Sequence, residues 1–344
     1  MERRRGTADT AARLYAEFRG SAFTTARAEG VGISARRLGL AAQAGCIVRL
    51  RRGLYVVPEA ATPAPQEAVT PAPREVATPA PLTVARHRVQ AYRARGVLAC
   101  VAEEAAASSW GLPHAPLTVA TIHVPRGATL HIGTRHGVRV RERDLDDVII
   151  FRDVPTTSPL ATARDLCRGL PRHQAVALFG MAQRRAAEWL IAGDERMDPA
   201  DLTQALADAQ WRAELGESMR GMLSASSRAQ AWCARADPRP ESYLEAISWG
   251  RFTGWKLGEM TPQVWVRGAS GRRYRVDVVI EGVAGEADGA IKYVTPDTLW
   301  KEKRRQEDIE QGGTPVVRWT FAEVEHHPRL LLERWRRALA AHST

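Results

Sequence analysis

The sequence predicts a multi-domain α/β protein, and three observations lead to this prediction. The chain has 344 residues, 44% of them hydrophobic, which is enough for two or three domains with packed cores. A tract rich in proline and alanine, residues 59–82, separates a short N-terminal region from the rest of the chain. After this tract, residues 83–344 alternate between segments of helical periodicity and segments typical of strands.

Residues 8–57 have the pattern of three helices followed by a hairpin. The predicted helices and strands are, in order, residues 11–18, 25–30, 35–44, 47–50 and 54–57. Ser34 precedes the third helix and is a residue type that caps helix N-termini. This order of elements is that of a winged helix, so residues 1–58 are predicted to form a winged-helix domain.

The basic residues of this region predict contact with double-stranded DNA. Arg36 and Arg37 fall in the first turn of the third helix, the end whose side chains reach into a major groove. Arg49, Arg51 and Arg52 fall on or beside the hairpin, within reach of backbone phosphates. A three-helix scaffold that makes no DNA contact is the alternative interpretation.

The distribution of charge supports this placement. Residues 1–100 contain 16 Lys and Arg against 7 Asp and Glu, whereas residues 101–344 contain 33 against 32. Arginine supplies 45 of the 49 basic residues, as the codon bias of a GC-rich genome would produce, so the net charge of +10 carries little information by itself. The local excess is typical of a nucleic-acid-binding module, although a solvated basic face would have the same composition.

The tract at residues 59–82 repeats Thr-Pro-Ala-Pro with a period of eight. Proline at this density blocks helix and ladder hydrogen bonds, so a semi-rigid disordered spacer is predicted, with a proline-rich recognition motif as the alternative. Residues 83–237 are predicted to form a middle α/β domain with a helical second half. The prolines at 238 and 240 end the helical pattern and predict a boundary before a last α/β domain, residues 238–344.

Several other classes of protein are excluded. No apolar run is long enough to span a membrane, and the basic N-terminus is not followed by the apolar core of a signal peptide. The four cysteines lie more than 50 residues apart, which predicts reduced thiols and a cytoplasmic location. The glycine-rich nucleotide-binding motifs and the hydrolase nucleophile elbow are absent.

Acidic residues in the last domain predict a metal-dependent site. Glu245 lies on a predicted helix, Asp277 in a strand, and Glu286 and Asp288 at alternate positions of the next strand, where they share one face. If the strands pair, Asp277, Glu286 and Asp288 could hold Mg²⁺ or Mn²⁺, which activates water and neutralises charge on a phosphodiester. Lys292 could stabilise the pentavalent phosphate. A plain acidic turn at residues 285–289 is the alternative.

The motifs FTT, SARRL and RRGLYVV of the N-terminal region resemble the winged-helix domain of the AbiEi family, antitoxins of abortive-infection systems that act as DNA-binding autorepressors. The motifs SSWGLP, IHVPRG and DVPTTSPLATARDL resemble the domain that follows in these proteins. The resemblance implies DNA binding and leaves a toxin partner or a homodimer as alternatives.

The last domain resembles the PD-(D/E)xK nuclease superfamily, near the very-short-patch-repair endonucleases. By this resemblance, Asp277 matches the first metal-binding Asp, Glu286 the acid of the second strand and Glu245 the upstream helical Glu. In the superfamily pattern a lysine follows the second acid by two residues, and this sequence has Asp288 there. Three interpretations are open: Lys292 takes the role of that lysine from a displaced position, the site works through metal alone, or the site is inactive. Residues 301–305 resemble the helix that follows, with a solvated basic face as the favoured interpretation of its charges.

The sequence therefore predicts two alternative functions. The first is a DNA-binding protein with a Mg²⁺-dependent endonuclease domain, acting in defence or DNA repair, with catalytic residues Asp277, Glu286, Asp288, Lys292 and Glu245. The alternative is a non-enzymatic transcriptional repressor or antitoxin-like regulator in which the nuclease fold is inactive. An RNA substrate stays open.

Overall fold

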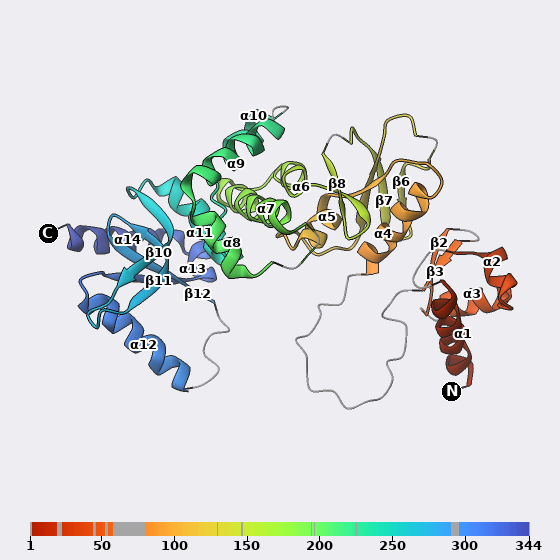
Figure 1. Ribbon diagram of the computed structural model, residues 1–344, viewed down its shortest axis with the longest axis horizontal. Helices are drawn as coiled ribbons and strands as arrows, with labels where there is room; N and C mark the ends of the chain where they lie inside the picture. Colours follow the sequence, from red (N-terminus) through yellow and green to blue (C-terminus); the bar gives the residue numbers. More distant parts are fainter. Residues whose placement is uncertain are drawn as a thin grey trace. The chain divides into compact units, whose positions relative to one another are not determined.

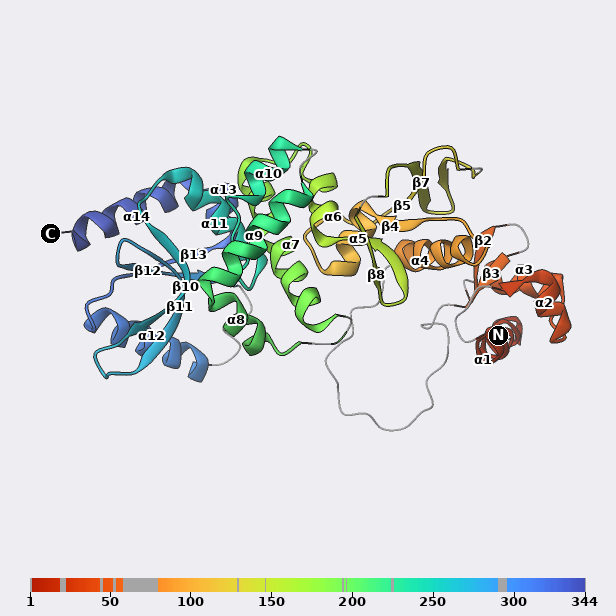
Figure 2. The same ribbon diagram turned by 45° about the horizontal axis from the view of Figure 1, so that its top comes forward.

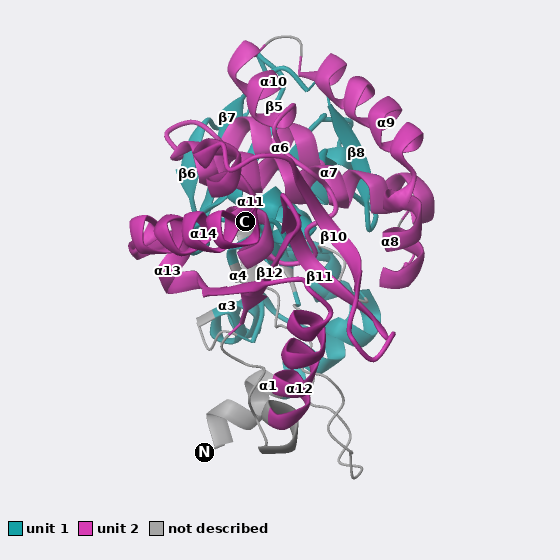
Figure 3. Ribbon diagram, turned by 90° about the vertical axis from the view of Figure 1, so that its left-hand side faces the viewer, with its two compact units in different colours: residues 1–158 teal, residues 159–344 magenta. Residues whose placement is uncertain are grey.

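The computed structural model describes residues 2–18, 23–43, 46–51, 54–57, 80–128, 130–145, 147–193, 195, 197–223, 226–289 and 296–343 (Figure 1). These residues form a mixed α/β structure, as the sequence predicts. They divide into two compact units, residues 1–158 and 159–344, which are coloured separately in Figure 3 and described one at a time below. None of the described helices has the length and apolar character needed to cross a membrane.

The first unit contains two sheets and the helices that accompany them. Its elements are α1 (Glu2–Phe18), β1 (Phe23–Thr24), α2 (Thr25–Gly30), α3 (Ala35–Gln43), β2 (Val48–Arg51), β3 (Leu54–Val56), α4 (Ala80–Arg93), β4 (Cys100–Ala102), α5 (Glu103–Trp110), β5 (Ala120–Val124), β6 (Gly133–Arg135), β7 (Val138–Glu142), β8 (Val148–Phe151) and β9 (Val154–Thr157). The strand order is β1-β3-β2 in the small sheet and β6-β7-β5-β4-β9-β8 in the larger, mixed sheet.

Local side-chain caps and a small core explain the N-terminal elements. Thr24 accepts a hydrogen bond from the Arg27 N–H at the start of α2, and Ser34 accepts one from the Arg37 N–H at the start of α3. The predicted helix at residues 25–30 is confirmed. Strand β1 was not predicted, because two residues are too few to show a strand pattern; it pairs with β3 and joins a core built from Leu14, Phe18, Phe23, Ile33, Leu38 and Tyr55.

The larger part of this unit begins at Ala80, where α4 starts. The last residues of the predicted spacer, 80–82, are therefore helical, whereas residues 59–79 lie outside the described part of the chain. The strands of the predicted middle α/β domain include β5, within residues 118–125, and β7 and β8, within residues 138–151.

A buried ion cluster joins the first residue of α5 to the larger sheet. Glu103 has a positive φ of 52°, an unusual conformation for a residue with a side chain. Its carboxylate contacts His123 Nε2 at 3.3 Å and accepts a hydrogen bond of 2.9 Å from Arg141. Burial opposes ionisation of Glu103, but the hydrogen bond with His123 and the charge of Arg141 outweigh it and lower its pKa to about 2.

The second unit contains a helical segment and a four-stranded sheet. Its elements are α6 (Pro159–Leu166), α7 (Arg172–Ala192), α8 (Pro199–Ala207), α9 (Ala209–Met222), α10 (Ser227–Cys233), α11 (Tyr243–Trp255), β10 (Met260–Arg267), β11 (Arg273–Ile280), β12 (Val283–Asp288), α12 (Pro296–Gln311), β13 (Val316–Thr320), α13 (Phe321–His326) and α14 (Pro328–His342). The strands follow the order β10-β11-β12-β13, antiparallel up to β12 and parallel between β12 and β13.

Helices cover both faces of this sheet. Helix α12 lies on one face, where Ile309 packs among Val276 and Ala284, and α11, α13 and α14 lie on the other (Figures 1 and 2). The second face holds the larger core, in which the rings of Phe252, Trp319 and Trp335 are 5.1–5.9 Å apart. These aromatic contacts between a helix, a strand and the C-terminal helix fix α11 over the sheet.

Helices α6 to α10 belong to the same compact unit as the C-terminal strands, so the domain boundary that the sequence predicts between residues 237 and 238 lies within the second unit and remains a prediction. The physical reason is the close packing of α7 against α11. A Cβ atom at Gly250 of α11 would lie only 2.2 Å from the backbone oxygen of His173 in α7. His173 and Arg251 also both contact the Glu325 carboxylate, which ties α7, α11 and α13 together.

We expect Gly250→Ala to lower the free energy of unfolding by about 2–3 kcal/mol, because the added methyl group meets backbone atoms, which can move only if the whole helix moves. Chemical denaturation of the full chain, followed by circular dichroism, measures this change.

The control is Gly254→Ala in the same helix, where an added Cβ meets nothing within 4 Å. Alanine favours helix over glycine by up to about 1 kcal/mol, so this variant should be neutral or slightly stabilised. Equal destabilisation by both substitutions would show that the close packing of α7 against Gly250 does not contribute to the free energy of unfolding.

Candidate functional site

The predicted acidic residues lie where strands β11 and β12 separate. The ladder between the two strands runs from Ile280 and Val283 to Val278 and Gly285 and has no further paired residues. Beyond it, the Ala287 N–H donates a hydrogen bond of 2.7 Å to the Asp277 carboxylate. The Asp277 carboxylate thus takes the place of a backbone carbonyl acceptor, and it lies between β11 and β12.

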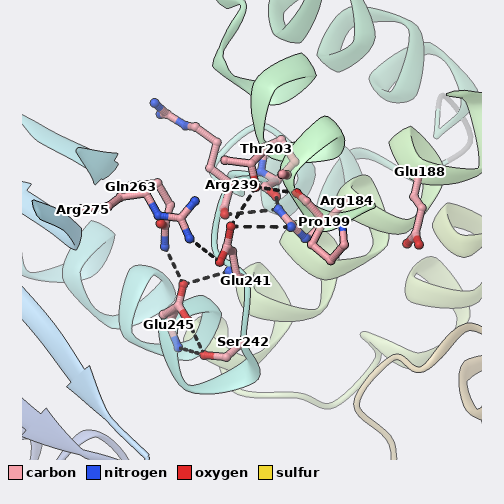
Figure 4. A network of polar contacts seen from close by, with 12 residues as sticks. Arg184, Glu188, Pro199, Thr203, Arg239, Glu241, Ser242, Glu245, Gln263 and Arg275 are labelled. Atoms are coloured by element: carbon pink, nitrogen blue, oxygen red, sulfur yellow. Dashed lines mark hydrogen bonds and ion pairs between the residues drawn. The ribbon is translucent and has the colours of Figure 1, made fainter. Parts of the chain in front are cut away.

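Glu245 approaches Asp277 from the first turn of α11. Its carboxylate accepts hydrogen bonds from the Ser242 hydroxyl at 2.6 Å, the Glu241 N–H at 2.8 Å and the Gln263 amide at 2.8 Å (Figure 4). Glu245 and Asp277 line one small pocket, together with Phe252 and Trp319. Burial and then the charge of Asp277 raise the pKa of Glu245.

A second carboxylate, Glu241, positions the start of α11. It accepts hydrogen bonds from Arg275 of β11 at 2.6 Å and from the Thr203 hydroxyl of α8 at 2.9 Å, and it faces Arg184 of α7 at 3.8 Å (Figure 4). These contacts join the sheet to the helical segment beside Glu245, so the position of Glu245 depends on both parts of the unit.

Glu286 is buried on the other side of Asp277 and is paired with a cation. Arg305 of α12 donates a hydrogen bond of 2.8 Å to Glu286 and another of 2.7 Å to the Arg275 carbonyl. Burial raises the pKa of Glu286, and the Asp277 charge raises it further, against the opposing effect of Arg305. A charge this well buried is tolerated because the guanidinium compensates it.

Asp288 and Arg318 extend the Glu286–Arg305 pair into a row of alternating charges, which we call the ionic chain. Arg318 of β13 donates to Asp288 at 3.4 Å and to Glu302 of α12 at 3.2 Å, and Glu302 in turn lies 3.5 Å from Arg305. Glu286 and Asp288 therefore share the face of β12 that α12 covers, as their alternate spacing predicts. Each of the two acids has an arginine partner.

The structure thus brings Glu245, Asp277 and Glu286 together around the point where β11 and β12 separate, and places Asp288 beside them on β12. Within the described part of the chain, no three His, Cys, Asp or Glu side chains are arranged to hold a metal ion. The metal site predicted at Asp277, Glu286 and Asp288 remains a prediction. Lys292 lies outside the described residues.

The predicted DNA-binding arginines are placed only in part. Arg36 and Arg37 are exposed in the first turn of α3, as predicted. Arg49 and Arg51 lie in β2, where the structure describes only the backbone, opposite Tyr55 and Leu54 of β3. Arg52 lies outside the described residues.

Sequence reasoning missed Arg305 and Arg318. The expectation that residues 301–305 form a solvated face is wrong for Arg305, which turns inward to Glu286. Helical spacing could have shown this, because Arg305 lies four residues before the buried Ile309 and therefore on the same side of α12. No local pattern identifies Arg318, because its partners Asp288 and Glu302 are distant in sequence.

We expect Arg305→Met to lower the free energy of unfolding by about 3 kcal/mol at neutral pH, because it leaves Glu286 ionised, buried and without its cation. Adding Glu286→Gln to this variant should recover part of the loss. Urea denaturation of the three proteins measures both changes.

Lys303→Met on the same helix is the control, since Lys303 makes an exposed pair with Glu307 and an exposed contact with the Trp300 ring, and its loss should change the free energy of unfolding by less than about 0.5 kcal/mol. If Arg305→Met were as mild as Lys303→Met, the ionic chain would not stabilise the unit.

Comparison with known proteins adds no family to these observations. No model of a known protein family matches the chain, and no curated protein matches it.

Proposed function

We propose that the chain is a DNA-binding protein whose C-terminal sheet and surrounding helices form a Mg²⁺-dependent endonuclease. In this proposal residues 1–58 are a winged helix that binds double-stranded DNA, and residues 238–344 are a nuclease domain of the PD-(D/E)xK type. The order of α11, three antiparallel strands, α12 and the parallel strand β13 agrees with the helix, strands, helix and strand that the motif resemblance implies.

The observation that carries the proposal is the proximity of Glu245 and Asp277. The two carboxylates line the same pocket, and Glu245 forms no ion pair with any described residue. Burial and the Asp277 charge both oppose ionisation of Glu245. Carboxylates that lie beside one another in a partly buried pocket raise each other's pKa and are typical of catalytic sites.

The donor set suits a hard divalent cation. Asp277, Glu286 and Glu245 supply only oxygen atoms, the ligands that Mg²⁺ and Mn²⁺ prefer, and their mutual repulsion is what such an ion relieves. Asp277 and Glu286 would hold the ion, and Asp288 lies beside them with Arg318. When bound, the ion would activate water and neutralise charge on the phosphodiester. Arg305 supplies positive charge beside Glu286.

We expect Asp277→Asn to reduce cleavage of plasmid and single-stranded DNA by about 100-fold or more in the presence of Mg²⁺ or Mn²⁺, because a metal ligand contributes several kcal/mol of transition-state stabilisation. Asparagine keeps an oxygen that can accept the Ala287 hydrogen bond, so the fold should be retained. Gel analysis of product over time measures the rate.

Glu307→Gln, which removes an exposed acid of α12, is the control and should cleave like the unsubstituted chain. No cleavage by the unsubstituted protein with either metal, or equal cleavage by Asp277→Asn, would reject the nuclease proposal.

A second candidate function is a non-enzymatic repressor or antitoxin-like regulator that binds its own promoter, alone as a homodimer or with a toxin. The observation that favours it is the pairing of Glu286 with Arg305 and Asp288 with Arg318, which gives both acids a structural use. In this case the ionic chain stabilises the unit, and DNA binding by the N-terminal region is the whole function.

Both candidates require DNA binding through α3. We expect Arg36→Ala to weaken binding of duplex DNA by about 1–3 kcal/mol and, where it removes a phosphate contact, to reduce the salt dependence of binding by about one unit of slope. Arg95→Ala, which removes the same charge from an exposed position after α4, is the control. Equal effects of the two substitutions in a mobility-shift titration would mean that α3 is not the DNA-contacting element.

A further inference from the structure

The β10–β11 hairpin exposes a tryptophan at the edge of the sheet. Trp265 of β10 is 56% exposed, although its neighbours Val264 and Val266 pack on the opposite face of the strand against the α12 side of the core. Among the described strands, β10 pairs with β11 alone, so Trp265 lies on an edge strand of the described sheet. At this exposure, roughly 100 Å² of its aromatic surface is available to a partner.

The position of Trp265 relates it to the acidic centre. It lies directly opposite Arg275 on β11, so the two side chains share one face of the hairpin. On this face Gln263 and Arg275 contact Glu245 and Glu241 at the start of α11. Trp265 lies two residues further out along β10 than Gln263, beyond the cover that α11 provides.

The hairpin is held rigidly from the opposite side. Asp308 of α12 accepts hydrogen bonds from the Ser270 N–H at 2.7 Å, the Ser270 hydroxyl at 2.6 Å and the Tyr274 hydroxyl at 2.9 Å. Its backbone oxygen also accepts the Ala269 N–H. A partner that binds this hairpin therefore has little conformational entropy to remove.

The charge around Trp265 is positive. Arg267, Arg272 and Arg273 are exposed, and residues 267–275 contain no acid. Within the described part of the chain these three arginines form no ion pair, unlike Arg275, Arg305 and Arg318. The guanidinium carbon of Arg273 lies 5.3 Å from the centre of the Trp265 ring, a cation–π contact. An anionic partner with flat aromatic groups suits this surface.

We propose that the β10–β11 hairpin binds a single strand of nucleic acid, with Trp265 stacked on an unpaired base and Arg267, Arg272 and Arg273 on the backbone phosphates. Stacking on an aromatic side chain requires a base whose face is free, which an intact duplex does not offer. A folded protein surface is less suitable, since it offers neither a regular row of phosphates nor a free planar face.

The spacing along the strands connects this surface with the proposed nuclease centre. Asp277 follows Arg275 by two residues, about 7 Å along β11, and stacked nucleotides advance about 3.4 Å each. A single strand that runs along β11 from a base on Trp265 would therefore place a phosphate beside Asp277 within about two nucleotides. The inference deepens the proposed function and rests on it: the substrate is single-stranded, or a duplex with an unpaired base near the cut.

The test compares Trp265→Leu with Trp265→Phe in the full chain, with Arg36→Ala and Arg37→Ala added to every protein so that the N-terminal region does not mask the effect. The probe is a fluorescent oligothymidine of about 12 nucleotides. EDTA is present, so binding is measured by anisotropy without cleavage. Trp265→Leu should bind about 5- to 150-fold more weakly, while Trp265→Phe, which keeps an aromatic face, should stay within about threefold.

Trp300→Leu is the matched control, because Trp300 is 60% exposed and has Lys303 over its ring, but lies on α12 away from the hairpin. Equal binding by Trp265→Leu and Trp265→Phe, or an equal loss with Trp300→Leu, overturns the proposal. So does a change of oligomeric state in Trp265→Leu without a change in oligonucleotide binding. A protein that needs Trp265 to bind the oligonucleotide but cleaves nothing with Mg²⁺ contradicts only the nuclease function.

Discussion

The hydrogen bond from the Ala287 N–H to the Asp277 carboxylate is the contact on which the C-terminal unit depends. The ladder between β11 and β12 stops at Val278 and Gly285, and this side chain supplies the next acceptor. An acid is thereby fixed between two strands, close enough to raise the pKa of Glu286 on one side and of Glu245 on the other. The surrounding structure must offset the resulting repulsion, because buried like charges destabilise a fold by several kcal/mol.

The compensation is uneven. Arg305 and Arg318, from α12 and β13, neutralise Glu286 and Asp288 and join them through Glu302. Glu245 instead receives hydrogen bonds from a hydroxyl, an amide and a backbone N–H, none of which carries charge. The ionic chain also links the strands to α12 on one face of the sheet, so the same contacts stabilise the fold and shape the acidic centre.

The sequence predicted what local chemistry determines. Helix α2 and strand β11 follow from periodicity, and the cap at Ser34 follows from residue type. It did not predict features that depend on residues far apart in the chain. The order of the four strands, the inward turn of Arg305 and the inclusion of α7 with the C-terminal strands all come from packing. Gly250 is an example, since a glycine is needed there only because the His173 backbone of α7 packs against it.

The unequal pairing of these acids with arginines bears on whether they only stabilise the unit or also bind a divalent cation. If the acidic residues only stabilised the unit, each buried carboxylate would be expected to have a cation, as Glu286 and Asp288 do. Glu245 also has a structural use, since it accepts hydrogen bonds from the Ser242 hydroxyl and the Glu241 N–H at the start of α11. That use does not require a position beside Asp277, whose charge raises the pKa of Glu245. In the proposed nuclease, a divalent cation and a phosphodiester would account for two carboxylates at this pocket, where β11 and β12 separate. The arginine pairs beside it are compatible with either use.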